Sequence, residues 1–177
     1  MRIITGLARG RRLFTPTGMD VRPTTDKVKE AMFSIIQFEL EGRRVLDLFA
    51  GTGQLGLEAI SRGASFAVFV DASRQSLDTV KKNIAATGFS DYSKTVLSDA
   101  FGYLSAANET FDIVFLDPPY EQKLCEKASP LLGRVLKPTS IVICETRVSE
   151  TMPETMGHLP RDRDHLYGSV KLTLYRQ

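Results

Sequence analysis

The sequence RVLDLFAGTGQLGLEAISR, residues 44–62, decides the fold that we expect for this chain. Its first six residues form an apolar run that predicts a buried strand, and a helix is predicted over 54–62. Between them, Gly51, Gly53 and Gly56 match the pattern G-x-G-x-x-G. Glycine permits a tight turn and lets backbone N–H groups approach a ligand closely. This junction of strand and helix therefore predicts a ligand site, although a plain turn also fits a lone match.

Downstream of this junction, short apolar segments alternate with amphipathic ones through most of the chain. Runs rich in Val, Ile and Phe are typical of parallel strands that are covered on both faces. We therefore predict an α/β fold with an open, doubly wound, mostly parallel and Rossmann-like sheet. The predicted strands are 44–49, 66–71, 93–98, 111–117 and 140–146, and the predicted helices are 54–62, 74–87, 99–107 and 121–136.

The two ends of the chain depart from this alternation. RIITG (2–6) and RRLFT (11–15) predict a small hairpin ahead of the sheet. Residues 24–40 predict a helix whose apolar stripe packs on the core. VKLTLYR (170–176) alternates as an antiparallel edge strand does, and Tyr167-Gly168 before it predicts a turn.

Length and composition exclude several classes of protein. The chain has 177 residues, of which 42% are hydrophobic and 25% charged, and this suits one globular domain. No apolar run is long enough to span a membrane, and none follows the basic start as in a secretory signal, so we expect a cytoplasmic protein. Cys125 and Cys144 belong to no CxxC or Cys/His cluster, so we expect reduced thiols and no metal site.

The net charge of +2 is too small to imply nucleic acid, but the charges are unevenly distributed. Residues 1–19 carry four arginines and no acidic residue. A basic arm on a nearly neutral body points to phosphate groups, although a solvated surface explains these charges equally well. The candidate RNA-binding residues of this arm are Arg2, Arg9, Arg11 and Arg12.

Carboxylates at the predicted strand ends indicate what the glycine turn binds. Asp47 lies inside the first strand, where a dinucleotide needs no carboxylate but a ligand with an ammonium group does. S-adenosylmethionine (SAM) carries an amino group and a sulfonium. Asp71 can accept hydrogen bonds from ribose hydroxyls, which NAD and SAM share, or it can cap the next helix. Asp99 fits either the adenine amino group or a helix N-cap.

The most informative motif is Asp117-Pro118-Pro119-Tyr120, which ends the fourth predicted strand. Ligands of doubly wound sheets bind at the carboxyl ends of strands, so this motif and the glycine turn share one edge. The prolines remove two backbone donors and leave carbonyl acceptors facing the site. Asp117 and the Pro118 carbonyl can hold the hydrogens of an aromatic amine, and Tyr120 offers a face on which the base stacks. In isolation, these four residues also fit an ordinary proline turn.

Together these residues resemble the amino-directed class I SAM methyltransferases, and most closely the RsmD family, which methylates N2 of one guanine in bacterial 16S ribosomal RNA. The resemblance covers nearly the whole chain, from RIITGLARGRRL through VRPTTDKVKEAMFSII and LDLFAGTGQLGLEAISRGA to DPPY and the tail YGSVKLTLYR. It implies that Arg22, Pro23 and Thr24 help to form the cofactor or target pocket. The chain departs from the family at Gln54, where a small or apolar residue is usual, and at Asp71, where Glu is common.

These observations predict a SAM-dependent enzyme of one domain over residues 1–177, with a basic hairpin and helix extension at 1–43 and a catalytic core at 44–177. The expected partner is ribosomal RNA or the small ribosomal subunit, and we expect a monomer with no metal and no membrane contact. The catalytic residues are predicted to be Asp117, Pro118, Pro119 and Tyr120. The predicted cofactor-binding residues are Asp47, Phe49, Gly51, Thr52, Gly53, Asp71, Ala72, Asp99, Ala100, Arg22 and Thr24.

Three other functions fit parts of the sequence. An amino methyltransferase acting on DNA adenine or on a protein glutamine fits DPPY alone, but the chain has no room for a separate target-recognition domain. An NAD-dependent oxidoreductase fits the glycine turn, yet it leaves Asp47 and DPPY unexplained. A non-enzymatic RNA-binding module leaves the intact DPPY motif without a purpose.

Overall fold

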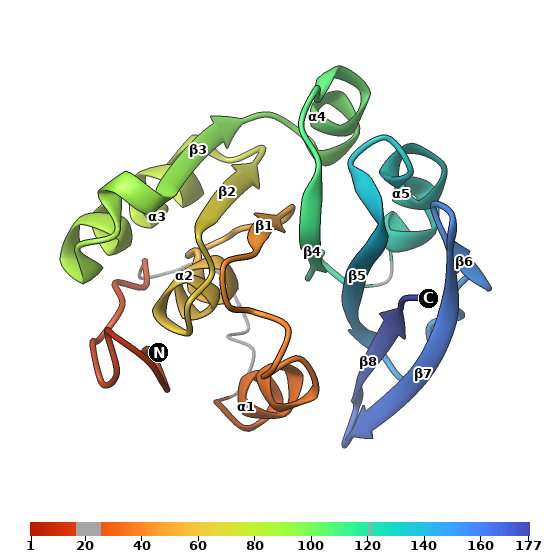
Figure 1. The fold of residues 1–177 in the computed structure, drawn as a ribbon, viewed down its shortest axis with the longest axis horizontal. Coiled ribbons are helices and arrows are strands. Elements are labelled where there is room, and N and C mark those ends of the chain that lie inside the picture. The colour runs from red at the N-terminus through yellow and green to blue at the C-terminus, as the bar shows by residue number, and fades with distance from the viewer. Residues whose placement is uncertain (17–25, 121) are drawn as a thin grey trace.

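The computed structural model describes residues 1–16, 26–120 and 122–177, and the elements in these ranges alternate as predicted (Figure 1). The helices are α1 (Asp26–Ile35), α2 (Gln54–Ser61), α3 (Arg74–Thr87), α4 (Ala100–Ala106) and α5 (Leu124–Leu132), with a 3-10 turn η1 (Ser90–Tyr92). The strands are β1 (Arg44–Asp47), β2 (Phe66–Asp71), β3 (Ser93–Leu97), β4 (Phe111–Leu116), β5 (Leu136–Arg147), β6 (Thr155–Met156), β7 (Leu159–Tyr167) and β8 (Val170–Tyr175).

The strands form one sheet in the order β3-β2-β1-β4-β5-β8-β7-β6. The pairs from β3 to β5 are parallel, and those that join β8, β7 and β6 are antiparallel. The direction of winding reverses between β1 and β4, and open α/β sheets bind ligands at such a switch point. The doubly wound, mostly parallel sheet with an antiparallel C-terminal edge is therefore confirmed.

Alternate residues along the strands point to opposite faces of the sheet, and each face carries its own hydrophobic core. Val45, Phe69 and Phe115 pack with α1, α2 and α3 on one face. Leu46 and Val68 pack with α4 and α5 on the other face. Figure 1 shows these two groups of helices on either side of the sheet. β4 is buried throughout and β2 is buried except at its two end residues, because both lie between two helical layers, as expected for parallel strands.

The N-terminal segments pair as the predicted hairpin. Arg2 and Arg12 form an antiparallel bridge, and the N–H of Ile3 donates to the carbonyl of Arg11 (2.9 Å). The helix predicted to reach residue 40 ends at Ile35, because the chain then turns back on itself. The first two residues of the predicted helix, Thr24 and Thr25, lie outside the described residues.

The C-terminal region differs from the prediction in one respect. The strand predicted at the edge, β8, lies between β5 and β7, so it is an internal strand of the sheet. β7 has the charged sequence LPRDRDHLY, whose apolar alternation is hidden because charged residues that pair with each other, such as Arg161 and Asp164, occupy its half-buried positions. The predicted turn at Tyr167-Gly168 joins the two strands, and Gly168 adopts a φ of 61°.

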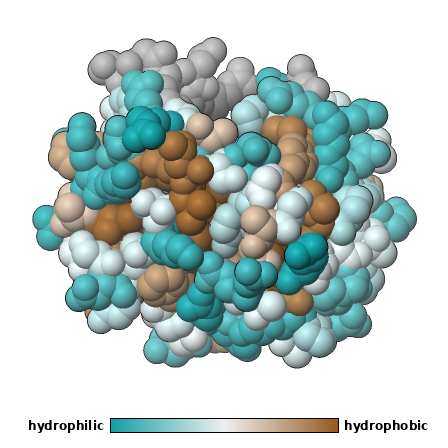
Figure 2. Space-filling view, turned by 90° about the horizontal axis from the view of Figure 1, so that it is seen from above, coloured by the Kyte–Doolittle hydropathy of each residue, from teal (hydrophilic) through white to brown (hydrophobic). Residues whose placement is uncertain are grey.

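The structure bears on three expectations from the composition, which concern membrane-spanning segments, exposed hydrophobic residues and the two cysteines. No helix in the described part of the chain is long and apolar enough to cross a membrane. On the face seen in Figure 2, exposed hydrophobic side chains form separate patches among hydrophilic ones. Cys125 and Cys144 are buried free thiols.

Candidate functional site

A cleft of about 700 Å³ opens at the carboxyl ends of the parallel strands. Asp47 ends β1 and Asp117 follows β4, so the two carboxylates flank the switch point of the sheet. The strand register supports this placement, because Asp47 pairs with Phe115, two residues before Asp117. The cleft is also lined by other predicted site residues, namely Phe49, Gly51, Thr52, Asp71, Ala72, Asp99, Ala100, Pro118, Pro119 and Tyr120.

Backbone conformation and close packing explain the three glycines of the turn. Gly51 and Gly53 adopt left-handed backbone conformations, with φ of 54° and 79°. Gly53 is the N-cap of α2 and is not among the residues that line the cleft. Gly56 instead allows α2 to pack closely on β2. A Cβ atom at Gly56 would lie 2.3 Å from Cε1 of Phe69, so no larger residue fits without a shift.

The N–H groups of these glycines donate to acceptors within the protein. The N–H of Gly51 donates to Oδ2 of Asp71 (2.8 Å), and that of Gly56 donates to Oδ2 of Asp47 (3.0 Å). The N–H of Gly53 donates to a carbonyl inside the turn (2.6 Å). Dinucleotide folds use such N–H groups to bind a pyrophosphate. The geometry therefore disfavours a dinucleotide, although the sequence pattern matches one.

Asp47 is buried, with 1% of its surface exposed, and this burial raises its pKa to about 7. The hydrogen bond from Gly56 lowers the pKa and the nearby charge of Asp71 raises it, both by less. Burial disfavours the charged form of a carboxyl group, and a nearby cation restores it. The site is therefore suited to a positively charged group of a ligand.

Asp71 and Asp99 both hold the local backbone and line the cleft. Oδ1 of Asp71 accepts from the N–H of Ser73 (2.8 Å), and Ser73 itself caps α3. Oδ1 of Asp99 accepts from the N–H groups of Phe101 (3.0 Å) and Gly102 (2.9 Å), so its interpretation as a helix N-cap is confirmed. A carboxylate has about four acceptor sites, so these bonds leave capacity for a ligand.

Two residues of β5 hold Tyr120 in place. Its hydroxyl donates to Oε1 of Glu145 (2.9 Å), a side chain that is 2% exposed. Cζ of Arg147 lies 5.2 Å from the centre of the Tyr120 ring, within range of a cation–π contact. Burial and the charge of Glu145 raise the pKa of Tyr120 above its usual value, so the hydroxyl remains a donor. Sequence reasoning missed Glu145, which lies near the end of the predicted strand 140–146, and Arg147, which directly follows that strand at the ligand-binding edge.

The cleft is acidic. Asp47, Asp71, Asp99 and Asp117 line it, and Arg147 is the one basic side chain among the described residues of its wall. Such a wall attracts a cation and repels a pyrophosphate. The described ranges contain no group of His, Cys, Asp and Glu that could hold a metal ion.

The candidate RNA-binding arginines lie outside this cleft. All four are exposed. Nε of Arg2 pairs with Oδ2 of Asp26 (3.4 Å), whereas Arg9, Arg11 and Arg12 surround a small separate hollow. The predicted pocket residues Arg22 and Thr24 fall in the range 17–25, which the structure does not describe.

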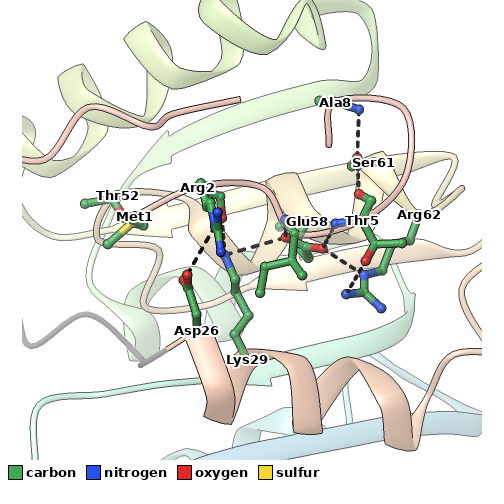
Figure 3. A network of polar contacts seen from close by, with 12 residues as sticks. Met1, Arg2, Thr5, Ala8, Asp26, Lys29, Thr52, Glu58, Ser61 and Arg62 are labelled. Atoms are coloured by element: carbon green, nitrogen blue, oxygen red, sulfur yellow. Dashed lines mark hydrogen bonds and ion pairs between the residues drawn. The ribbon is translucent and has the colours of Figure 1, made fainter. Parts of the chain in front are cut away.

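The N-terminal hairpin is bonded to α2, the helix that begins at the glycine turn (Figure 3). Oε2 of Glu58 accepts from the N–H of Ile4 (2.8 Å), and Oε1 accepts from that of Thr5 (3.0 Å). Glu58 is fully buried, and its charge is balanced by Lys29 (3.5 Å) and Arg62 (2.8 Å). The hairpin is therefore joined by buried polar contacts to the helix that follows the glycine turn.

The sheet order, the cleft at the switch point and the acidic strand ends define a class I SAM-dependent methyltransferase fold. A family model described as "Conserved hypothetical protein 95" matches residues 1–176. The chain belongs to this family, the RsmD family of ribosomal RNA methyltransferases.

Individual relatives match the chain over nearly its whole length. Ribosomal RNA small subunit methyltransferase D of Escherichia coli (strain K12) is 33% identical, with 100% of this chain and 90% of the relative covered. The protein of the same name from Haemophilus influenzae is 34% identical, with coverages of 99% and 93%. The solved structure of the Escherichia coli protein yhhF is similar with a TM-score of 0.89 and 34% identity, covering 100% of this chain and 97% of that one.

Proposed function

We propose that this protein transfers the methyl group of SAM to the exocyclic N2 amine of a guanine in small-subunit (16S) ribosomal RNA. The acidic cleft carries the assignment of the cofactor, because its carboxylates suit a cationic ligand with hydroxyl and amino donors. The names of the Escherichia coli and Haemophilus influenzae relatives support small-subunit ribosomal RNA as the substrate.

The residues of the cleft fit SAM by their chemistry. Asp47 would receive the amino group, Asp71 the ribose hydroxyls and Asp99 the adenine amine. Bound SAM supplies a methyl group activated by the sulfonium to which it is attached. The proposed cofactor set is completed by Phe49, Gly51, Thr52, Gly53, Ala72 and Ala100, with Arg22 and Thr24 in the range outside the described structure.

The DPPY motif would position the target amine. The Asp117 carboxylate and the Pro118 carbonyl accept hydrogen bonds from the two amine hydrogens, and Tyr120 stacks on the base. These contacts direct the nitrogen lone pair at the methyl carbon. Bound SAM would supply the leaving group, because its sulfur would take the electrons of the broken C–S bond and leave as a neutral thioether. The nitrogen would then release one proton, which the Asp117 carboxylate would accept.

The basic arm would supply affinity for the RNA backbone, since phosphate contacts dominate protein–nucleic acid binding. Arg2, Arg9, Arg11 and Arg12 are exposed on the arm and lie apart from the cofactor cleft. We further propose that the protein works in the cytoplasm as a monomer of one domain, with the hairpin and α1 as an extension of the core, and without a metal ion.

The test is a parallel methylation assay with labelled SAM. Small ribosomal subunits, total RNA, DNA and protein extract are offered separately, and Asp117→Ala serves as the inactive control. We expect label in 16S ribosomal RNA, recovered as N2-methylguanosine after digestion to nucleosides. Label in DNA or protein alone contradicts the proposal. Calorimetry should show binding of SAM and no binding of NAD.

A further inference from the structure

Phe14 combines an exposed ring with a firmly held backbone. Its N–H donates to Oδ1 of Asn83 (2.6 Å), and Nδ2 of Asn83 donates back to its carbonyl (3.1 Å). The same Nδ2 donates to the carbonyl of Thr52 in the glycine turn (2.9 Å). Asn83 is fully buried in α3, whereas Phe14 is 58% exposed. One buried amide therefore ties an exposed aromatic residue to the cofactor turn.

Single exposed hydrophobic residues are common on proteins, so exposure alone identifies nothing. Two further features distinguish Phe14. The buried side chain of Asn83 fixes the backbone of Phe14 with two hydrogen bonds. Phe14 also belongs to the same hairpin as the exposed cations Arg9, Arg11 and Arg12. An aromatic face beside positive charge is the arrangement that binds unpaired nucleotides, because bases stack on the ring and phosphates meet the cations.

The position of Phe14 also suits this role. Thr52 lines the cleft. The amide nitrogen of Asn83 donates both to the carbonyl of Thr52 and to that of Phe14, so it bridges the two backbones. A target base must leave its stack to enter the cleft, and its neighbour in the RNA then loses a stacking partner. An aromatic ring whose backbone is tied through Asn83 to Thr52 of the cleft wall can replace that partner.

We propose that Phe14 stacks on an unpaired nucleotide of the RNA that adjoins the target guanine, and that Asn83 is the positioning residue for this contact. The inference rests on the proposed function, because it takes RNA as the substrate. It adds an aromatic contact to the phosphate contacts of the arm. The contact contributes to RNA affinity and leaves cofactor affinity unchanged.

Steady-state kinetics on small ribosomal subunits that lack the modification test the contact. Loss of one stacked base should raise the RNA KM of Phe14→Ala about tenfold or more, with the SAM KM unchanged. Phe14→Trp should retain wild-type KM, whereas Phe14→Leu should behave like Phe14→Ala. Phe38→Ala is the matched control, because Phe38 is 91% exposed in the turn after α1 and outside the arm.

The outcomes separate this inference from the proposed function. A wild-type protein that methylates no small-subunit RNA overturns the proposed function itself. An active wild type with an unchanged RNA KM in Phe14→Ala overturns only the stacking contact. Equal losses in Phe14→Leu and Phe14→Trp also overturn it, because the aromatic ring would then have no special role.

Fluorescence gives an independent readout, because the chain contains no tryptophan. Phe14→Trp introduces a single reporter, and Phe38→Trp is its control. A transcript of 16S ribosomal RNA should quench the first variant and leave the second unchanged, since stacking on a base quenches indole emission. Quenching of neither variant, or of both equally, contradicts the proposal.

The positioning role of Asn83 is tested by a double-variant cycle on the RNA KM. Asn83→Ala should raise the KM, and adding it to Phe14→Ala should raise the KM little further, because both changes remove the same contact. If the effects of the two substitutions on the RNA KM were fully additive, Asn83 would have only a structural role.

Discussion

The hydroxyl of Tyr120 donates a hydrogen bond to the buried carboxylate of Glu145, which joins the loop after β4 to strand β5 (2.9 Å). Arg147, two residues further along β5, covers one face of the same ring. A base can therefore stack only on the opposite face. The orientation of the proposed stacking platform is set by β5 as well as by the DPPY motif.

Replacement of Tyr120 separates the roles of its ring and its hydroxyl. Tyr120→Phe removes a donor from a buried carboxylate, so we expect the free energy of unfolding to fall by about 1–3 kcal/mol and kcat to fall with it. Tyr120→Ala should lose more activity, because the stacking face is also removed. Urea denaturation and steady-state kinetics measure both effects, with Tyr92→Phe on the exposed turn η1 as the control. A Tyr120→Phe variant equal to wild type in both would show that the bond is unimportant.

Asp117→Ala should abolish methyl transfer while SAM affinity stays within a few-fold of wild type. The reason is that Asp117 is assigned to the target amine, whereas Asp47, Asp71 and Asp99 are assigned to the cofactor. Calorimetry with SAM and a single-turnover assay measure the two properties. If SAM binding and activity were lost together, Asp117 would have to be assigned to the cofactor site instead of the target amine.

Asp47 predicts an unusual dependence on pH. Its pKa is about 7 in the folded protein but about 3.9 in an unfolded chain, so between these values the folded state retains a proton that the unfolded state has lost. The free energy of unfolding of the ligand-free protein should therefore fall as the pH rises from about 4 to about 7. Asp47→Asn keeps an acceptor for the N–H of Gly56 and should lose this part of the dependence.

The same group should make SAM binding sensitive to pH. The cationic amino group of SAM favours the ionised carboxylate, so affinity should rise with pH up to about 7 in the wild type. In Asp47→Asn, affinity should be weaker and should show no rise over this range. Calorimetric titrations between pH 5.5 and 8.5, a range of about 1.5 units on either side of the pKa, provide the comparison. Equal pH profiles in both proteins would contradict the assignment.

Gly56→Ala tests the close packing of α2 on β2. The added methyl group would lie 2.3 Å from the Phe69 ring, so we expect a loss of about 1–3 kcal/mol of stability from overpacking. Gly133→Ala is the control, because Gly133 has helical backbone angles and its nearest neighbours would lie 4.0 Å from the new methyl group. Thermal or urea unfolding of both variants measures the difference, and equal stabilities would mean that the ring moves aside at no cost.

The basic arm predicts a salt-dependent defect. Simultaneous replacement of Arg9, Arg11 and Arg12 by Gln should raise the RNA KM and flatten its dependence on salt, because fewer counterions are released on binding. SAM affinity should be nearly unchanged. The control replaces Lys127 and Arg134, two exposed cations on and just after α5. If the arm variant keeps the wild-type salt slope, the exposed Arg163 of β7 becomes the candidate, because Lys171 is buried and Arg161 is paired with Asp164.

Local patterns in the sequence were sufficient for much of the site. Strand ends and glycines are local features, so the cleft that contains Asp47, Asp71 and Asp117 could be predicted from alternation and spacing. Glu145 and Arg147 could not be linked to Tyr120 in this way, because that contact depends on β5 lying beside β4. The prediction of β8 as an edge strand was wrong for a similar reason. The strand that covers its other side, β7, carries many charged residues and was therefore not recognised in the sequence.

The bonds between Glu58 and the backbone of Ile4 and Thr5 have a consequence for protein engineering. Ser61 adds to them, because its hydroxyl accepts from the N–H of Ala8 (3.0 Å) and donates to the carbonyl of Thr5 (2.6 Å). The hairpin is therefore not a detachable module that could be exchanged between enzymes by cutting the chain after it. A graft that aims to redirect such an enzyme to another RNA must transplant the receiving face of α2 together with the hairpin.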